Sequence, residues 1–280
     1  MIYTTLSNGV LMPRLGLGTF LVADGESAYD TVLHALKVGY RHIDTAQMYR
    51  NEGSVGDAIV ASGIKRSEIF ITTKQRGHST PEKMRLQFEE SLQKLKTDYV
   101  DLYLIHWPNP DKTINQQTWA LFEELYKEKK VRAIGVSNFQ RHHIEDLMET
   151  ATIKPMVDQV ELHPGLTQIP LQRYLNHAGI QIESYGPLMK GGVFEGIWQE
   201  GLQKIADKYH ATIAQVIISW GLHRNVIMIP KSVTPSRIEE NFGALKLSLS
   251  EEDIKTINEL NRGKRVYTDP DNSPWGPYSE

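Results

Sequence analysis

The sequence of 280 residues contains no cysteine. This absence excludes disulfide bonds, thiolate nucleophiles and metal sites built on cysteine ligands. A chain without disulfides suits a reducing compartment, so we expect a cytoplasmic protein.

The sequence also lacks a long hydrophobic run and a strong charge of one sign. The longest apolar stretch lies around residues 226–230, which is far too short to cross a bilayer, and residues 1–13 lack the features of a secretory signal. The net charge is −3, so no broad basic surface is expected. We therefore expect neither a membrane nor a nucleic acid as a partner.

The composition that remains is that of an ordinary globular protein, with 40% hydrophobic and 23% charged residues. No linker-like stretch divides the chain, and we expect a single domain over residues 1–280. An Asn8-Gly9 pair between short apolar runs predicts an N-terminal β-hairpin, with positive φ at both turn positions.

After the hairpin, strand and helix patterns alternate. Runs typical of buried strands lie at residues 14–18, 40–44, 69–73, 100–105, 131–136, 157–160, 180–184 and 226–229. Helical spacing of apolar residues lies at 27–38, 81–95, 118–128, 142–149, 171–177, 201–209, 213–222, 237–246 and 251–260. This order predicts an α/β fold of the (β/α)8 TIM barrel type with a short C-terminal tail. The alternative, an open doubly wound sheet, is disfavoured because Gly16-Leu17-Gly18 lacks the third glycine of a dinucleotide-binding turn.

Four polar residues follow successive strands of this barrel. Asp44, Lys74 and His106 come at the ends of the second, third and fourth strands, and Tyr49 lies in the loop after Asp44. Active sites of such barrels form where strands end, so these side chains are expected to converge. A tyrosine hydroxyl can donate a proton, and a lysine cation beside it should lower its pKa. The set predicts reduction of a carbonyl, although each residue alone is more often an ion-pair member or an ordinary core residue.

A second cluster follows the eighth strand. Lys231 and Ser232 precede Thr234-Pro235, which predicts a capped helix start, and Arg237 lies in the first turn. Cations at the positive end of a helix favour a phosphate ligand. A solvated basic turn remains the alternative.

These segments resemble the aldo-keto reductases. The resemblance rests on Asp44-Thr45-Ala46-x-x-Tyr49-x-Asn51-Glu52 and on the segments at residues 104–108, 135–139 and 229–232, in the family's order. Within the family the chain is similar to short bacterial reductases of diketo-gluconate and methylglyoxal. The resemblance implies a barrel that uses NADPH without a Rossmann fold, and a small-molecule carbonyl substrate. It also implies a monomer.

The resemblance also implies roles for individual residues. Asp44, Tyr49, Lys74 and His106 match a catalytic tetrad in which Tyr49 is the general acid. Gly18, Thr19, Phe20 and Asp44 match cofactor contacts near the first two strands. Ser137, Asn138 and Gln159 match residues that bind the nicotinamide carboxamide, and Tyr185 matches the residue that stacks on the nicotinamide ring. The other matched contacts are Gly186, Leu188 and Lys190 over the pyrophosphate, Lys231, Ser232 and Arg237 around the 2′-phosphate, and Glu240 and Asn241 at the adenine. No metal ion is implied.

The substrate pocket is expected to be lined by Phe20, Tyr49, His106, Trp107 and Trp275, the last from a tail folded over the barrel mouth. One departure from the family concerns Gln75-Arg76-Gly77-His78, where many relatives place an apolar wall. Polar groups there would favour acidic or sugar-like carbonyls, unless Arg76 points to solvent, which is the favoured interpretation.

Two other functions remain open at this point. One is a regulatory barrel that binds NADPH with little turnover, which the intact tetrad argues against. The other is a metal-dependent hydrolase that uses His106, Glu161 and His163.

Overall fold

The computed structural model describes residues 1–272. In it the chain forms a closed barrel of parallel strands. Neighbours follow chain order: β3 Leu17–Gly18, β4 His42–Asp44, β5 Phe70–Lys74, β6 Val100–Ile105, β7 Val131–Ser137, β8 Val157–Glu161, β9 Gln181–Tyr185 and β10 Ile227–Met228. A parallel bridge between Leu15 and Met228 joins the first strand to the last. The predicted barrel is confirmed, with all eight predicted strands.

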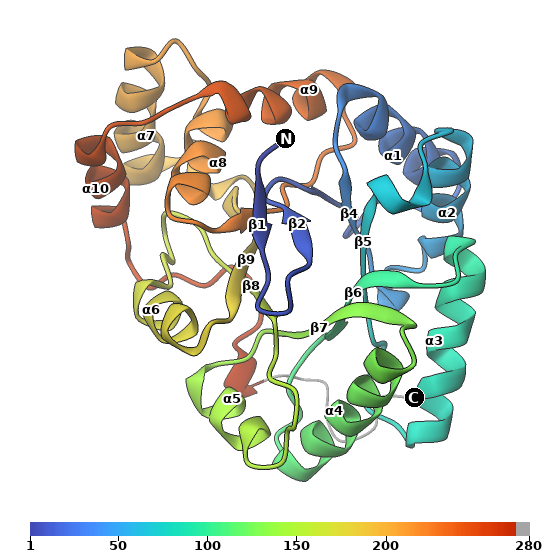
Figure 1. Cartoon of the computed structure of the whole chain (residues 1–280). Coiled ribbons are helices and arrows are strands. Elements are labelled where there is room, and N and C mark those ends of the chain that lie inside the picture. Colours follow the sequence, from blue (N-terminus) through green and yellow to red (C-terminus); the bar gives the residue numbers. More distant parts are fainter. Residues whose placement is uncertain (273–280) are drawn as a thin grey trace.

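A ring of helices surrounds this sheet (Figure 1). Its members are α1 Glu26–Val38, α2 Glu52–Ala61, α3 Pro81–Leu95, α4 Lys112–Lys127, α5 Arg141–Met148, α6 Ile169–Ala178, α8 Ile213–His223 and α9 Pro235–Gly243. Two further helices, α7 Gly196–Lys208 and α10 Glu251–Glu259, pack against each other and against α8. Short 3-10 turns lie at η1 Gln47–Tyr49, η2 Arg66–Glu68, η3 Met189–Phe194, η4 Ala244–Lys246 and η5 Pro270–Asn272. Among the helices of residues 1–272, none combines the length and apolar composition that crossing a bilayer requires.

Helix α2 is the element that sequence patterns did not predict. Its small residues hide the apolar periodicity, yet they serve the packing of α2 against α3. A Cβ atom at Gly56 would lie 2.3 Å from the carbonyl oxygen of Lys94, so only glycine allows this close approach. The other differences concern helix starts: α4 begins at Lys112 behind the N-cap Asp111, and α7 begins at Gly196.

The N-terminal hairpin closes the end of the barrel at which the strands begin. Strands β1 Tyr3–Thr5 and β2 Leu11–Pro13 pair antiparallel, and Figure 1 shows them across the centre of the ring. The side chain of Asn8 donates to the carbonyl oxygen of Arg132 at the start of β7 (2.9 Å). The turn differs from the prediction, because only Gly9 has a positive φ (88°) and Asn8 does not. Since the hairpin covers this end, the carboxyl ends of the strands form the open mouth.

Candidate active site

The mouth of the barrel brings the four predicted catalytic residues together. Asp44 and Lys74 are the last residues of β4 and β5, His106 follows β6 directly, and Tyr49 ends the turn η1. Parallel strands end at one edge, which is why residues distant in sequence meet here.

Lys74 is the centre of the cluster and is fully buried. Its Nζ atom donates to both carboxylate oxygens of Asp44 (2.7 and 2.8 Å) and lies 2.9 Å from the carbonyl oxygen of Thr45. It also lies 3.3 Å from the hydroxyl oxygen of Tyr49, which accepts a hydrogen bond. Because this oxygen accepts from Lys74, the hydroxyl proton of Tyr49 is directed elsewhere and is available to a ligand.

The loop that carries Tyr49 is held by Asn51, which is completely buried. The side-chain amide of Asn51 donates to the carbonyl oxygens of Thr19 and Val22 (3.0 Å each) and accepts from the hydroxyl of Thr45 (2.8 Å). This single side chain therefore joins the loop after β3 to the loop after β4. The loop that carries Tyr49 is therefore attached to the neighbouring loop at the barrel mouth.

The pKa of Tyr49 is raised well above its usual value. Burial has the largest effect, followed by the negative charge of Asp44 and by Tyr267 and Glu183. The expected lowering of this pKa is therefore wrong in its net direction, because burial and the groups with the next largest effects all raise it. Tyr49 holds its proton throughout the neutral range.

His106 lies beside Tyr49, with ring centroids 5.6 Å apart in an edge-to-face arrangement. Burial, and next the positive charge of Lys74, lower the pKa of His106 well below its usual value. The imidazole is neutral at neutral pH, with one donor and one acceptor nitrogen. Within residues 1–272 its buried Nδ1 atom has no hydrogen-bond partner.

The next strands place the residues matched to the nicotinamide on the adjoining wall. Asn138, with φ of 66°, donates to the carbonyl oxygen of His106 (3.0 Å) and accepts from the hydroxyl of Tyr185 (2.7 Å). The hydroxyl of Ser137 donates to the backbone oxygen of Gln159 (2.8 Å). Asn138 thus contacts His106, Gln159 contacts Asp44 through its side chain (2.8 Å), and Ser137 and Tyr185 adjoin these two residues.

The loop between β3 and α1 completes this rim of the mouth. A Cβ atom at Gly18 would lie 2.9 Å from the carbonyl oxygen of Ile229, so a glycine lets β3 approach the strand at the other edge of the sheet. The hydroxyl of Thr19 donates to the carbonyl oxygen of Asp44 (2.9 Å). Phe20, which is 43% exposed, packs its ring 5.1 Å from that of Tyr49.

The second predicted cluster forms the start of α9. The side chains of Lys231 and Arg237 are exposed, and no carboxylate of residues 1–272 lies within 4.0 Å of either cation. Thr234 occupies the N-cap position but makes no side-chain cap, which corrects the expected cap. The carboxylate of Glu240 accepts from Thr212 (2.8 Å), and Asn241 is buried.

The C-terminal tail reaches the mouth through contacts that sequence reasoning missed. The buried carboxylate of Glu161 accepts from the backbone N–H groups of Val266 (2.6 Å) and Tyr267 (3.4 Å). The ring of Tyr267 packs edge to face against Tyr185, with centroids 5.2 Å apart, and Lys190 Nζ lies 4.2 Å from the Tyr267 ring centroid.

This tail also meets the predicted pyrophosphate loop. Gly186 has φ of 60°, and a Cβ atom there would lie 2.5 Å from the Tyr267 ring. Leu188 is half-buried, and Lys190 donates to the carbonyl oxygen of Val266 (2.9 Å). Tyr267 is therefore a site residue whose place depends on the path of the tail, for which the sequence offers no local signal.

The remaining expected pocket residues fall in different places. Trp107 is half-buried, and its carbonyl oxygen lies 3.0 Å from Nε2 of His78. Trp275 lies outside the described residues. Arg76 is exposed, and His78 is buried with a pKa lowered chiefly by burial, so His78 adds no cation here at neutral pH.

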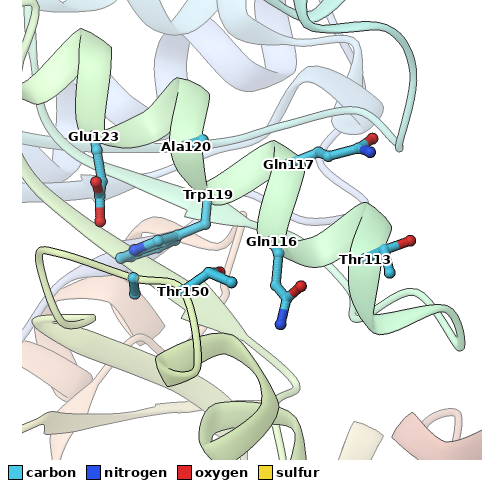
Figure 2. A pocket seen from close by; sticks show the side chains of 8 residues that line it. Thr113, Gln116, Gln117, Trp119, Ala120, Glu123 and Thr150 are labelled. Carbon is cyan, nitrogen blue, oxygen red and sulfur yellow. The ribbon is translucent and has the colours of Figure 1, made fainter.

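Two other features of residues 1–272 lie outside the mouth. A hollow of about 320 Å³ lies between α4 and residues 150–151, with no tetrad member in its lining. Figure 2 draws the side chains that line it, among them Thr113, Gln116 and Trp119. The group of His, Asp and Glu side chains close enough to share a cation in this range is His142, His143 and Asp271, not the His106, Glu161 and His163 set of the hydrolase hypothesis. Glu161 instead accepts from the backbone N–H of Val266, and its Oε1 atom lies 3.0 Å from Nε2 of His163.

Comparison with known proteins agrees with this geometry. The profile of the aldo/keto reductase family matches residues 14–262. The chain is 49% identical over 270 residues to a glyoxal reductase of Bacillus subtilis (95% of each chain), and 42% identical over 269 residues to the methylglyoxal reductase DkgA of Escherichia coli (95% of this chain, 96% of DkgA). The solved structure of a Gox0644 mutant in complex with NADPH superimposes with a TM-score of 0.88 at 36% identity, covering 97% of this chain and 98% of that one. The expected family resemblance is confirmed: the chain belongs to the aldo/keto reductase family and is an oxidoreductase.

Proposed function

We propose that this enzyme reduces aldehydes and ketones to alcohols with NADPH, and that Tyr49 is the general acid. One observation carries the proposal. Lys74 binds both oxygens of Asp44 and donates to the hydroxyl oxygen of Tyr49, which directs the Tyr49 proton toward the open mouth.

The residues of the mouth fit the cofactor. Lys231 and Arg237 lie at the start of α9 without a carboxylate partner in the described chain, as a 2′-phosphate would require. Ser137, Asn138 and Gln159 would hold the nicotinamide carboxamide, Tyr185 its ring, and the 186–190 loop the pyrophosphate. When bound there, NADPH supplies the hydride that the carbonyl carbon receives.

The protein's own part in the reaction is to orient the carbonyl and to deliver a proton. The neutral imidazole of His106 can donate one hydrogen bond to the carbonyl oxygen and hold it near the Tyr49 hydroxyl. As negative charge develops on that oxygen, Tyr49 releases its proton to it, and the Lys74 cation stabilises the tyrosinate that remains. Asp44 compensates the buried charge of Lys74, which would otherwise be costly.

For the substrate we propose small α-dicarbonyls, with keto-sugars as a second class. The names of two relatives, a glyoxal reductase and a methylglyoxal reductase, support this choice. Arg76 is exposed, and we take its side chain to point to solvent rather than to select acidic carbonyls. We further propose that residues 1–280 act as one domain, as a monomer and in the cytoplasm.

The test is a panel of glyoxal, methylglyoxal, simple aldehydes and keto-sugars, run with NADPH and in parallel with NADH. The proposal expects loss of the absorbance of reduced nicotinamide with dicarbonyls, and a higher kcat/KM with NADPH than with NADH. An enzyme that binds NADPH but oxidises it with no carbonyl of the panel would instead be the low-turnover barrel protein.

A further inference from the structure

A second buried carboxyl group lies beneath the tetrad, inside the barrel. Glu183 belongs to β9 and is completely buried, and its register partner on β8 is Gln159. The Nε2 atom of Gln159 donates to Oε2 of Glu183 (2.9 Å) and to Oδ2 of Asp44 (2.8 Å). One amide therefore bridges a tetrad residue and a carboxyl group that no step of the proposed reaction uses.

This bridge determines which way the Gln159 amide faces. An amide nitrogen has two N–H bonds, and here both are used by the two acidic side chains. A flipped amide would place its carbonyl oxygen against the Asp44 carboxylate, which is strongly unfavourable. The amide oxygen Oε1 is thus kept free as an acceptor, and no group of residues 1–272 donates a hydrogen bond to it.

The buried carboxyl group of Glu183 makes few stabilising interactions. Within the described chain its Oε1 atom has no hydrogen-bond partner, and the nearest cationic candidate, Nε2 of His42, lies 3.7 Å away. Burying a carboxyl group with one oxygen unsatisfied costs stability. A role in folding alone does not explain such a group, whereas a role in orienting Gln159 does.

From this geometry we infer that Glu183 is a positioning residue, which holds the Gln159 amide so that its oxygen accepts from the carboxamide N–H group of the cofactor. The inference rests on the proposed function, because it needs a nicotinamide at this wall. Glu183 itself touches neither cofactor nor substrate, and it acts through Gln159.

The charges around Glu183 add a pH dependence to this role. The charged or titratable groups that face it are Asp44 and His42 from β4, Lys74 from β5 and Tyr49 from η1, whereas β8 and β10 present the neutral Gln159 and Ile227. Burial, and next the charge of Asp44, raise the pKa of Glu183 to about 8. Above this pH a second negative charge lies beside Asp44, raises the pKa of Tyr49 further and opposes the negative charge that develops on the carbonyl oxygen.

The experiment compares E183Q and E183L in the full-length enzyme. The glutamine of E183Q keeps an oxygen that accepts from Gln159 but cannot ionise, whereas the leucine of E183L removes the acceptor. Asp158→Asn is the matched control, since Asp158 is an equally buried carboxyl residue on β8 with no contact to the tetrad. Each variant is measured by fluorescence titration with NADPH, by kcat and KM with methylglyoxal from pH 6 to 10, and by thermal unfolding.

We expect E183L to bind NADPH roughly 10- to 100-fold more weakly, as for a lost hydrogen bond that fixes a binding group. E183Q should bind NADPH within about threefold of wild type, and its kcat should lack the decline near pH 8. D158N should keep wild-type affinity.

Three results would overturn the inference. The first is a folded E183L with wild-type NADPH affinity. The second is a loss of NADPH affinity that is proportional to the loss of melting temperature in both E183L and D158N. The third is an E183Q enzyme with the wild-type pH profile of kcat. The last result decides the question even where E183L does not fold. Failure of the proposed function is distinguished by the wild-type enzyme, which would then oxidise no NADPH with any carbonyl.

Discussion

Tyr49 is held so that one group contacts its oxygen while its proton remains free. Replacing it by phenylalanine keeps the ring packed against Phe20 and His106 and removes only the hydroxyl. We expect Y49F to lose roughly 10²- to 10⁴-fold in kcat, the usual contribution of a general acid, while its Kd for NADPH stays near wild type. Stopped-flow turnover within threefold of wild type would show that another group donates the proton.

Arg237 is the residue with which to test cofactor choice. A charge-assisted hydrogen bond to phosphate contributes about 1.5–3 kcal/mol, so R237A should weaken NADPH binding by about tenfold or more and NADH binding little. The control is R173A, which removes an exposed arginine on α6. Fluorescence titrations in which R237A loses both cofactors equally would remove the 2′-phosphate role.

At the residue scale, sequence reasoning reached the side chains that follow strands and missed those that meet them from elsewhere. Asp44, Lys74 and His106 follow apolar runs, so their convergence is predictable from the fold. Glu183 had a signal, a charged residue inside an apolar strand run, whose meaning depends on its register with Gln159. Tyr267 had no signal, because only the folded tail brings it to Tyr185.

Residues 265–267 of the tail contact the barrel at Glu161, at Tyr185 and at Lys190. Glu161 accepts from two of its backbone N–H groups, and Arg265 lies 3.9 Å from the same carboxylate. In E161Q one of the two acceptor oxygens becomes an amide nitrogen that cannot accept, and the negative charge is lost, so the tail should open more often.

We expect trypsin to cleave E161Q after Arg262, Lys264 and Arg265 about tenfold faster than wild type. This factor corresponds to the loss of a contact of about 1.5 kcal/mol. Mass spectrometry of timed digests measures this rate. The matched control E259Q changes an exposed residue of α10, and its digestion should follow wild type. Equal rates in E161Q and wild type would mean that other contacts hold the tail.

Helix α2 shows which elements remain hidden in a sequence. Long amphipathic helices such as α3 were predicted with their bounds, because apolar residues recur every three or four positions. In α2 the residues Gly53, Ser54 and Gly56 interrupt that recurrence, and the close approach that explains Gly56 exists only once α3 is present. The hairpin turn failed in detail for a related reason, since two turn types share the Asn-Gly pair.

For the whole molecule, two buried groups with opposite shifts limit the pH range of greatest stability. The pKa of Glu183 is raised from 4.5 to about 8, so burial of this group lowers the stability of the fold least below about 4.5, and stability is lost as pH rises through 8. The pKa of His42 is lowered from 6.5 to about 3 by burial and by Lys74, so its contribution is present above 6.5 and is lost as pH falls toward 3.

The wild-type enzyme should therefore have its highest free energy of unfolding between about pH 4.5 and 6.5, the unfolded-state pKa values of the two groups. Between pH 6 and 9 its melting temperature should fall about 3 to 10 °C more than that of E183Q, in which position 183 cannot ionise. Calorimetry of both proteins across this range measures the difference. Parallel curves would show that Glu183 is already ionised in the folded state at pH 6, so that its pKa is not raised.

The bridge between Leu15 and Met228 has a consequence for how the protein is made. The two residues that close the barrel lie more than 200 positions apart in the chain. A ribosome adding about 5–20 residues per second needs roughly 10 to 40 s to travel that distance. Throughout this time the first strand has emerged while its second neighbour does not yet exist, and its unpaired edge is exposed to other nascent chains. The newborn protein is thus most vulnerable to aggregation before its last strand leaves the ribosome, and chaperones that shield a strand edge should matter most then.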